Sequence, residues 1–268
     1  MPLRLTLPPT LAERLERSDR PLIGGWVVSD STANAELMAG AGFDVILVEG
    51  EHSTLSLGEL QRHLQVLAAY PVTPLVRVPI GDTVLIKQFL DLGAQNLLVP
   101  MVDDAAQAEA VVRAMHYPPR GVRGVGSALA RSARWGRVEG YLGRASDTVS
   151  LTVQIETATA VSNVDAILAV DGVDAIFVGP SDLAASMGVI GQQDHPDVVS
   201  AVELAISAAK AAGKPVGVNA FAPAMAQRYL ETGADFVFVG ADVQLLARAA
   251  EALAARYLGE DRGTKESY

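Results

Sequence analysis

The stretch DVILVEGEHSTLSLGELQRHLQVLAAYPVTPLVRVP, residues 44–79, contains one strand–helix–strand unit. Its two ends, DVILVEG (44–50) and TPLVRVP (73–79), are apolar on both alternating faces, which is typical of parallel strands that are buried on both sides. Between them, GELQRHLQVLAAY (58–70) has the apolar spacing of an amphipathic helix. The stretch therefore predicts two parallel strands joined by a helix.

The same unit recurs along nearly the whole chain. Eight strand-like runs occupy residues 23–29, 44–50, 73–79, 96–102, 150–156, 174–180, 215–220 and 235–241. Eight strand–helix units in about 250 residues are the layout of a (β/α)8 TIM barrel. We predict a single α/β barrel domain over residues 1–258 and a polar tail over residues 259–268. A doubly wound open sheet is the alternative, and the absence of GxGxxG after the first strand argues against it.

The segments between the strands carry matching helix-end signals. Gly42, Gly93, Gly213 and Gly233 each follow a helical pattern and precede a strand, where glycine suits a left-handed C-cap. The polar residues in SDSTANAE and VDDAAQAE suit helix N-caps. Two longer insertions, at residues 117–147 and 181–197, interrupt the rhythm, and long irregular segments of this kind are often functional.

The composition excludes several classes of function. Half of the 268 residues are hydrophobic, 19% are charged, and the formal net charge is −10, which argues against general binding to nucleic acid or to an anionic membrane. No apolar run reaches the roughly 18 residues of a membrane span, and the charged N-terminus does not look like a secretory signal. With no cysteine, the chain has no disulfide and no thiolate site, which fits a protein of the reducing cytoplasm. The acidic charge still allows an anionic small molecule to be held by a local arginine.

In a TIM barrel, the active site lies at the C-terminal ends of the strands, so the polar residues there are the candidates. They are Glu49, Glu51 and His52 after the second strand, Arg77 on the third, Gln154 and Glu156 on the fifth, Ser181 and Asp182 after the sixth, Asn219 on the seventh and Asp242 after the eighth. Because these ends converge on one mouth, the sequence predicts a cluster of acids with one histidine and one arginine.

Several of these residues admit two interpretations. Glu156 and Asp182 suit an octahedral oxygen site for Mg²⁺ or Mn²⁺, but they could equally cap the helices that follow. Arg77, among apolar residues, must be paired, either with a bound anion or in a structural salt bridge. His52 is a candidate general base because it ends a strand beside two carboxylates.

The four lysines give a useful negative result. Lys87, Lys210, Lys214 and Lys265 lie in a helical pattern, near a helix end, before a strand and in the tail, so none ends a strand. A Schiff-base mechanism therefore has no obvious nucleophile. If carbon–carbon chemistry occurs here, a metal ion is the better electron sink.

The motifs resemble those of the HpcH/HpaI aldolase family, the class II metal-dependent pyruvate aldolases, in particular the 4-hydroxy-2-oxoheptanedioate aldolases. The matching stretches are ILVEGEHS, LVRVP, DLGAQNLLVPMV, YPPRGVRGVGSALARSARWG, VQIET and GVDAIFVGPSDLAASMG. They span about residues 20 to 255, nearly the whole chain. The long arginine-rich segment, and VQIET together with FVGPSDL, are the most specific.

The resemblance implies a retro-aldol lyase that releases pyruvate and an aldehyde from a 4-hydroxy-2-oxo acid. It implies that Glu156 and Asp182 hold Mg²⁺, Mn²⁺ or Co²⁺, and that Gln154 and the backbone at Ser181 bind the pyruvyl part of the substrate. Arg77 would stabilise the enolate oxygen and His52 would be the base. Asp91 matches an acid that raises the basicity of the histidine.

The resemblance also implies a homo-oligomer, typically a hexamer with exchanged C-terminal helices. Asp91 ends the helix before the fourth strand, on the bottom face of its own barrel, so it could reach His52 only from a neighbouring subunit. Glu49 departs from the family pattern, which usually reads Asp-Gly-Glu-His at this point, and we keep it among the catalytic candidates. Glu51 is expected to face away from its neighbours if the strand alternation continues.

Two questions stay open at this level. The aldehyde half of the substrate is expected to meet Phe221, and arginines of residues 120–137 could clamp a second carboxylate. The alternative functions are a lyase of the citrate-lyase β-subunit or malyl-CoA type, and a non-catalytic anion-binding barrel. The first of these has no extra segment for a CoA-like thioester, and clustered acids at one mouth argue against the second.

Overall fold

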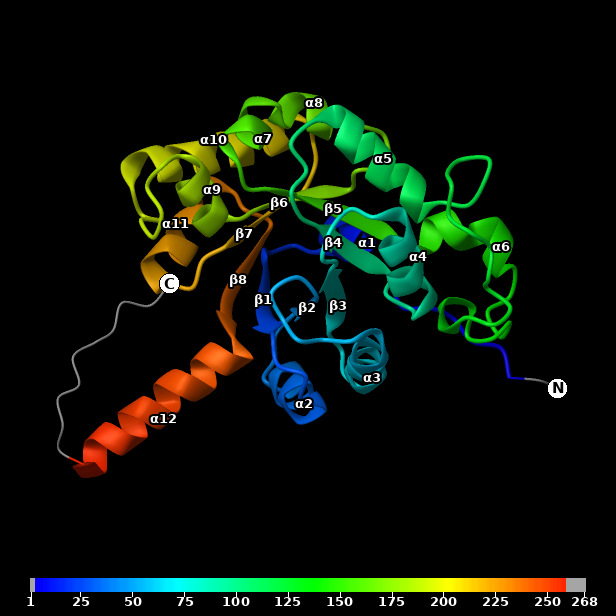
Figure 1. Ribbon diagram of the computed structural model, residues 1–268, viewed down its shortest axis with the longest axis horizontal. Coiled ribbons are helices and arrows are strands. Elements are labelled where there is room, and N and C mark those ends of the chain that lie inside the picture. Colours follow the sequence, from blue (N-terminus) through cyan, green and yellow to red (C-terminus); the bar gives the residue numbers. More distant parts are fainter. Residues whose placement is uncertain (1–2, 259–268) are drawn as a thin grey trace.

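Eight parallel strands form a closed barrel in the computed structural model, which describes residues 3–258 (Figure 1). The strands are β1 (Leu22–Val27), β2 (Val45–Glu49), β3 (Thr73–Arg77), β4 (Asn96–Val99), β5 (Ser150–Ile155), β6 (Ala175–Val178), β7 (Val216–Asn219) and β8 (Phe236–Ala241). Each strand pairs with the next in sequence, and β8 closes on β1. The predicted TIM barrel is confirmed and the open sheet is wrong, while the predicted tail at 259–268 lies outside the described residues.

Helices cover the outside of the barrel and separate its strands (Figure 1). They are α1 (Leu11–Arg17), α2 (Thr32–Gly40), α3 (Leu57–Leu67), α4 (Thr83–Asp91), α5 (Ala105–Met115), α6 (Tyr141–Arg144), α7 (Ala158–Ser162), α8 (Val164–Leu168), α9 (Pro180–Ser186), α10 (Pro196–Ala211), α11 (Pro223–Thr232) and α12 (Asp242–Leu258), with the 3-10 turns η1 (Arg131–Ala133) and η2 (Ala145–Thr148). Ser31 and Asp104 cap α2 and α5 as expected, and all four predicted C-cap glycines have positive φ.

The strand period of two sorts the core into two layers. Ile46 and Val48 of β2 face outward and pack in the large cluster beneath the helices. Val45 and Leu47 face inward and pack in the barrel interior, where Phe177, Phe236 and Phe238 make aromatic contacts with one another and Trp26 contacts two of them. Because the alternation continues to the end of each strand, Glu49 and Arg77 occupy the next inward positions.

Two glycines make room for the interior aromatic rings. A Cβ atom on Gly217 of β7 would lie 2.1 Å from the ring of Phe236, and one on Gly24 of β1 would lie 2.4 Å from the ring of Phe238. Both rings are held on several sides inside the closed barrel, so neither can move aside without a large cost in packing energy. These two positions therefore fix how the rings fill the barrel below the site.

Gly217→Ala is expected to lower the free energy of unfolding by about 1–3 kcal/mol, because the added methyl group overpacks the barrel interior. Gly143→Ala is the matched control, since a Cβ atom there meets nothing within 4 Å. Urea unfolding of the two variants followed by tryptophan fluorescence measures the difference. Equal midpoints would contradict the packing argument.

The two ends of the barrel are closed differently. Helix α1 covers the N-terminal end, where the buried Leu11 donates its backbone N–H to Asn96 Oδ1 at 2.6 Å. At the other end, Asp242 begins α12 and its carboxylate accepts the backbone N–H groups of Val28 (2.8 Å) and Ser29 (3.3 Å). Asp242 thus ties β8 and α12 to the end of β1, and α12 then projects away from the barrel (Figure 1).

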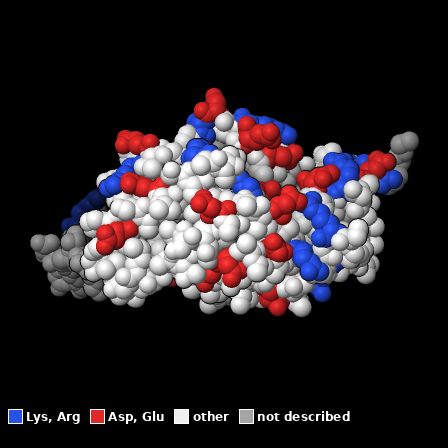
Figure 2. All heavy atoms as spheres, turned by 90° about the horizontal axis from the view of Figure 1, so that it is seen from above, with Lys and Arg blue, Asp and Glu red and all other residues white. Residues whose placement is uncertain are grey.

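The surface agrees with the acidic composition. On the face in Figure 2, acidic side chains are spread over the whole surface, and the basic ones lie in small groups between them rather than in one continuous patch. No helix within residues 3–258 is long and apolar enough to cross a membrane.

Candidate active site

A cavity of about 750 Å³ opens at the C-terminal end of the barrel. Most of the predicted strand-end residues line it together: Glu49, His52, Arg77, Gln154, Ser181, Asp182 and Asn219. The remaining wall comes from Trp26, Val28, Phe177, Gly179, Pro180, Phe221, Ala241, Val243, Gln244 and Arg248. The strand ends therefore converge on one mouth, as the barrel prediction requires.

The Arg77–Glu49 ion pair is the most buried charged contact of the site. The two residues are register partners on β3 and β2, so their side chains leave the sheet side by side on its inner face. Arg77 Nε donates to Glu49 Oε2 at 2.8 Å, and Nη2 lies 2.7 Å from the same oxygen in the ion pair. Arg77 Nη1 lies 3.4 Å from Gln154 Oε1, and the guanidinium stacks over Trp26 with its Cζ 4.7 Å from the ring centroid. Arg77 is thus held by three groups, Glu49, Gln154 and Trp26.

The other oxygen of Glu49 organises the turn that follows β2. Glu49 Oε1 accepts the backbone N–H groups of Glu51 (2.6 Å) and His52 (2.8 Å), and Ser53 Oγ donates to the Glu49 carbonyl (2.7 Å). A Cβ atom on Gly50 would lie 2.4 Å from the carbonyl oxygen of Arg77, so only glycine fits there. Glu49 therefore contacts the backbone of His52, and its carboxylate links the turn to Arg77.

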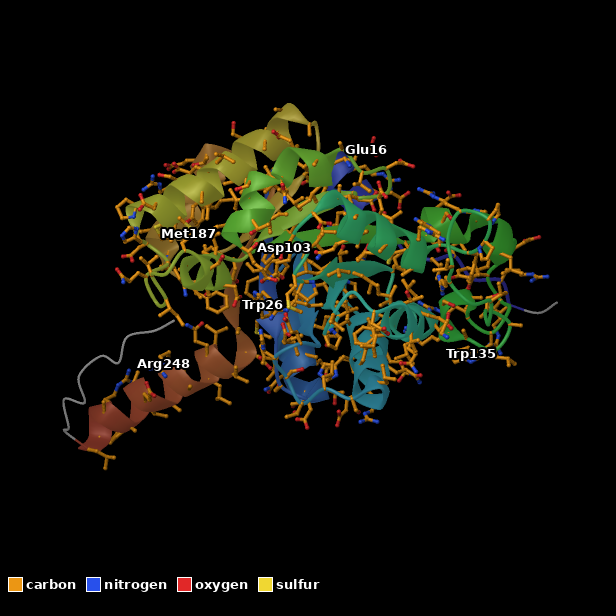
Figure 3. The ribbon with its side chains drawn as sticks, turned by 45° about the horizontal axis from the view of Figure 1, so that its top comes forward. Glu16, Trp26, Asp103, Trp135, Met187 and Arg248 are labelled. Atoms are coloured by element: carbon orange, nitrogen blue, oxygen red, sulfur yellow. The ribbon has the colours of Figure 1, made fainter. Side chains whose placement is uncertain are left out.

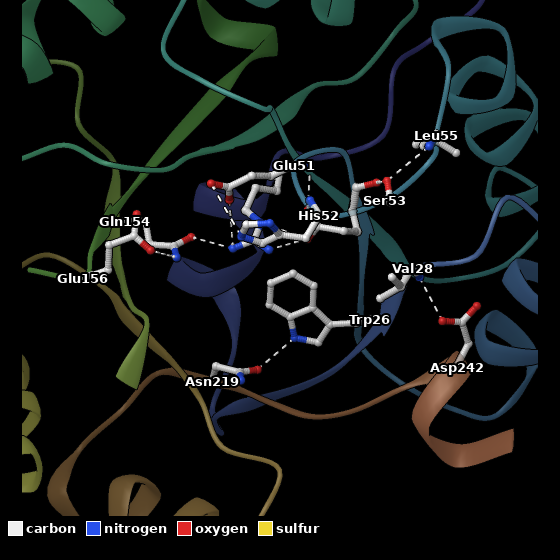
Figure 4. A network of polar contacts seen from close by, with 12 residues as sticks. Trp26, Val28, Glu51, His52, Ser53, Leu55, Gln154, Glu156, Asn219 and Asp242 are labelled. Carbon is white, nitrogen blue, oxygen red and sulfur yellow. Dashed lines mark hydrogen bonds and ion pairs between the residues drawn. The ribbon is translucent and has the colours of Figure 1, made fainter. Parts of the chain in front are cut away.

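This turn corrects the expectation for Glu51. The strand ends at Glu49, so Glu51 and His52 do not point to opposite faces: His52 Nε2 lies 3.8 Å from Glu51 Oε1, and both side chains are at the site (Figure 4). Glu51 Oε2 lies 3.2 Å from Arg77 Nη1, but the approach is not aligned for a hydrogen bond and this buried oxygen has no other protein partner within residues 3–258. Burial raises the pKa of Glu51, against the opposing charge of Arg77.

His52 lies at the mouth of the cavity. Its side chain is 68% exposed, and Nε2 is 3.8 Å from Glu51 Oε1. The imidazole therefore faces solvent and the cavity, with the Glu51 carboxylate beside it.

Glu156 lies just beyond the end of β5. Its Oε1 accepts the backbone N–H of Met101 at 2.6 Å, and its Oε2 accepts a hydrogen bond from Gln154 Nε2 (Figure 4). Burial raises the pKa of Glu156 to about 7, and the negative charges of Asp182 and Glu51 add to this, against the Met101 N–H. Met101 has a left-handed backbone, φ 57°, so the donor is supplied from a strained conformation.

The capping interpretation of Glu156 and Asp182 is wrong. Thr157 caps α7, and Gly179 begins α9 without any side-chain cap, so Asp182 lies within the first turn of that helix. Asp182 lines the cavity, and Glu156 lies beside it, bound to Gln154 and to the backbone of Met101. A Cβ atom on Gly179 would lie 2.9 Å from Gln154 Nε2 and 3.4 Å from Glu156 Oε2, so the glycine keeps the space beside these groups open. No cluster of three or more acidic or histidine ligands exists within residues 3–258.

Asp91 lies where the sequence places it, on the opposite end of the barrel. It is the last residue of α4, and its Oδ1 accepts a hydrogen bond from Arg123 Nη2 at 2.8 Å. Arg123 is fully buried and also stacks over Tyr117. Within one chain, Asp91 is therefore not brought to His52.

Sequence reasoning missed part of the cavity wall. Trp26 donates its Nε1–H to Asn219 Oδ1 at 2.9 Å and forms the floor beneath Arg77 (Figure 4). Its inward position near the end of the first predicted strand could have revealed it. Gln244 and Arg248 could not have been found this way, because they lie on a helix after the last strand.

The chain has many known relatives. A sequence model of the family described as HpcH/HpaI aldolase/citrate lyase matches residues 22–249. A protein from Salmonella heidelberg (strain SL476) named 4-hydroxy-2-oxo-heptane-1,7-dioate aldolase is 51% identical over 246 residues, which cover 92% of this chain and 94% of that relative. A relative of the same name from Salmonella newport (strain SL254) is 52% identical over 241 residues, 90% of this chain and 92% of that one.

Solved structures of similar proteins have the same architecture. A HpcH/HpaI aldolase/citrate lyase family protein from Burkholderia cenocepacia J2315 superposes with a TM-score of 0.88 at 38% identity, covering 93% of this chain and 99% of that one. A HpcH/HpaI aldolase from Desulfitobacterium hafniense DCB-2 superposes with a TM-score of 0.84 at 29% identity, covering 97% and 100%.

Proposed function

The chain belongs to the HpcH/HpaI aldolase/citrate lyase family, and from this premise we propose that it is a metal-dependent aldolase that cleaves 4-hydroxy-2-oxo acids into pyruvate and an aldehyde. The relatives named 4-hydroxy-2-oxo-heptane-1,7-dioate aldolase favour a substrate of that type over a CoA thioester. The observation that carries the proposal is the convergence of Arg77, Gln154 and Asp182 beside His52 in one cavity. Glu156 lies next to this cavity, bound to the amide of Gln154.

The charge of the site supports a bound cation. Four carboxylates, those of Glu49, Glu51, Glu156 and Asp182, meet here with the guanidinium of Arg77 close to them. An anionic keto acid would be repelled by this excess of negative charge unless a cation offsets it. Burial raises the pKa of Glu156, and Glu51 has a buried carboxylate oxygen without a hydrogen-bond partner within residues 3–258. Both observations show carboxylates held away from water, where negative charge is unfavourable.

The residues fit a divalent metal ion. Glu156 and Asp182 would hold it, and their oxygen donors suit Mg²⁺, Mn²⁺ or Co²⁺. With two protein carboxylates, the remaining positions are open to water and to a keto acid. When bound, the metal supplies a Lewis acid that stabilises negative charge on the 2-oxo group.

Arg77 and Gln154 position the pyruvyl half of the substrate. Glu49 and Trp26 fix the Arg77 guanidinium before substrate binds, so the cation costs little reorganisation when negative charge develops on the enolate oxygen. Gln154 bridges Arg77 and Glu156, which orients its amide, and the backbone at Ser181 borders the same space. Glu49 acts as a positioning residue, since it holds both Arg77 and the backbone of His52.

His52 is the proposed general base. It takes the proton of the 4-hydroxyl group as the bond between C3 and C4 breaks, and the electron pair of that bond passes to the pyruvate enolate. Protonation of the enolate carbon then gives pyruvate. Glu51, 3.8 Å from His52 Nε2, stabilises the imidazolium formed in this step.

We also propose that the protein is a homo-oligomer. Helix α12 projects from its own barrel and exposes Leu246, Leu253, Tyr257 and Leu258, which a partner subunit would cover. Asp91 faces away from its own His52 and would serve a neighbouring site in a hexamer. Analytical ultracentrifugation measures the assembly state, and a fully active monomer would contradict this arrangement.

EDTA treatment is expected to abolish pyruvate release from 4-hydroxy-2-oxo acids, with activity restored by Mg²⁺, Mn²⁺ or Co²⁺. Lactate-dehydrogenase-coupled detection of pyruvate measures this. Borohydride added with pyruvate should leave the mass of the chain unchanged, because no residue lining the described cavity is a lysine. Full activity in EDTA, or a trapped adduct that is absent without pyruvate, would rule out the metal mechanism.

A further inference from the structure

A second guanidinium, that of Arg248, lines the cavity besides that of Arg77. Arg248 lies in the second turn of α12, beyond the end of β8 (Figure 3). Arg77, in contrast, is buried at the end of β3. Arg77 is already bound to Glu49 and close to Glu51 and Gln154. The positive charge of Arg248 is therefore the one at the mouth that substrate can still recruit.

The present partner of Arg248 is weakly bound. Its Nη1 contacts Glu251 Oε2 at 2.8 Å, three residues along the same helix, and the two side chains are 48% and 59% exposed. A solvent-exposed pair of this kind contributes little stability. The Arg248 guanidinium can therefore leave Glu251 and bind a substrate carboxylate at a small cost in free energy. The guanidinium also offers a planar fork that matches a carboxylate.

Part of the cavity wall is apolar. Phe221, after β7, and Val243, on the first turn of α12, both line the cavity. The cavity thus presents a polar end at Gln154 and Asp182, an apolar wall, and a cation at its outer rim. This sequence of surfaces matches a keto acid whose far end carries a second carboxylate beyond a short run of methylene groups.

The arginines of residues 120–137 do not provide this clamp within the chain. None of them lines the cavity. Arg123 pairs with Asp91, and Arg131 donates to the backbone carbonyls of Leu64 and Leu92 at the N-terminal end of the barrel. The sequence-based expectation of a clamp from that segment is therefore wrong for the cavity of the same subunit.

We propose that Arg248 binds the distal carboxylate of the substrate, so that the enzyme prefers dicarboxylic 4-hydroxy-2-oxo acids and, in the reverse reaction, aldehydes that end in a carboxylate. The inference rests on the proposed function. Because this contact is the same before and during bond cleavage, its loss raises KM and leaves kcat nearly unchanged.

The test compares two aldehydes of equal length in the addition of pyruvate, succinic semialdehyde and butanal, which differ by the terminal carboxylate. With Arg248→Gln, kcat/KM for succinic semialdehyde is expected to fall about tenfold through KM, corresponding to about 1.4 kcal/mol. The value for butanal should change less than about twofold, since it makes no such contact. Arg248→Lys should recover part of the loss.

Arg256→Gln is the matched control, because it removes the same charge from the exposed last turn of α12 without touching the cavity. An equal loss in Arg256→Gln, or an unchanged preference in Arg248→Gln, would overturn the proposal. If wild type joins neither aldehyde to pyruvate, the proposed function fails. Calorimetric binding of 2-oxoheptanedioate and 2-oxoheptanoate then decides whether Arg248 still recognises a second carboxylate: tighter diacid binding that Arg248→Gln abolishes supports it, and equal binding overturns it.

Discussion

Replacing His52 by alanine is expected to lower kcat for pyruvate release by about 10²–10⁴-fold, the usual contribution of a positioned general base. The affinity for the divalent metal should stay close to that of wild type, because His52 lies at the mouth and the proposed ligands are Glu156 and Asp182. Steady-state kinetics, with titration of Mn²⁺ binding in the same preparations, separates the two effects.

The control for His52→Ala is His195→Asn. His195 is a helix N-cap on α10 that accepts the backbone N–H of Asp197 at 3.3 Å, and asparagine preserves that function. This variant should retain wild-type kcat. If His52→Ala were as active as His195→Asn, another group would have to accept the hydroxyl proton.

Glu156→Gln is expected to reduce kcat/KM by about 10³-fold at a fixed metal concentration, since it removes one of two proposed carboxylate ligands while keeping the side-chain shape. Its Mn²⁺ dissociation constant should rise in parallel. Glu109→Gln, an exposed change on α5, is the control for the loss of one negative charge. Unaltered Mn²⁺ binding by Glu156→Gln would remove Glu156 as a ligand.

The metal-free protein offers a test of Glu156 that does not depend on activity. Its pKa is raised from 4.5 to about 7, so between these values the folded chain holds a proton that the unfolded chain has released. Stability should therefore fall as pH rises from 4.5 to 7, by roughly 3 kcal/mol from this group at about 1.4 kcal/mol per pH unit. In urea unfolding with EDTA present, Glu156→Gln should lose this part of the pH dependence. If stability depended on pH in the same way in wild type and in Glu156→Gln, the pKa of Glu156 would not be raised by burial.

For Glu49, the residue pattern predicted the position of the side chain but not its contacts. The sequence identifies it as a strand-end acid next to His52, and as a departure from the usual aspartate of the family. The structure shows that its two oxygens are divided, one binding Arg77 and the other binding the backbone N–H groups of Glu51 and His52. The expectation for Glu51 was wrong because a turn held by Glu49, rather than a continued strand, sets its direction.

Local pattern was sufficient for the fold and for the level of the site. Apolar runs with period two define the strands, and the closed barrel needs no more than their number and their alternation with helices. The same alternation that buries Leu47 and Leu75 inside the barrel carries Glu49 and Arg77 to its mouth. The candidate residues at the strand ends could therefore be predicted without any long-range contact.

Contacts between distant residues could be known only from the tertiary structure. Trp26 binds Asn219, which is 193 residues away along the chain, Met101 supplies its backbone N–H to Glu156, and Arg248 reaches the cavity from a helix that follows the last strand. The raised pKa of Glu156 likewise depends on which groups exclude water from it.

The sequence by itself thus determined the barrel and the chemistry available at its mouth, because both follow from short-range periodicity. Which charges are paired and which are exposed was decided by packing, because burial and ion pairing depend on neighbours that are far apart along the chain.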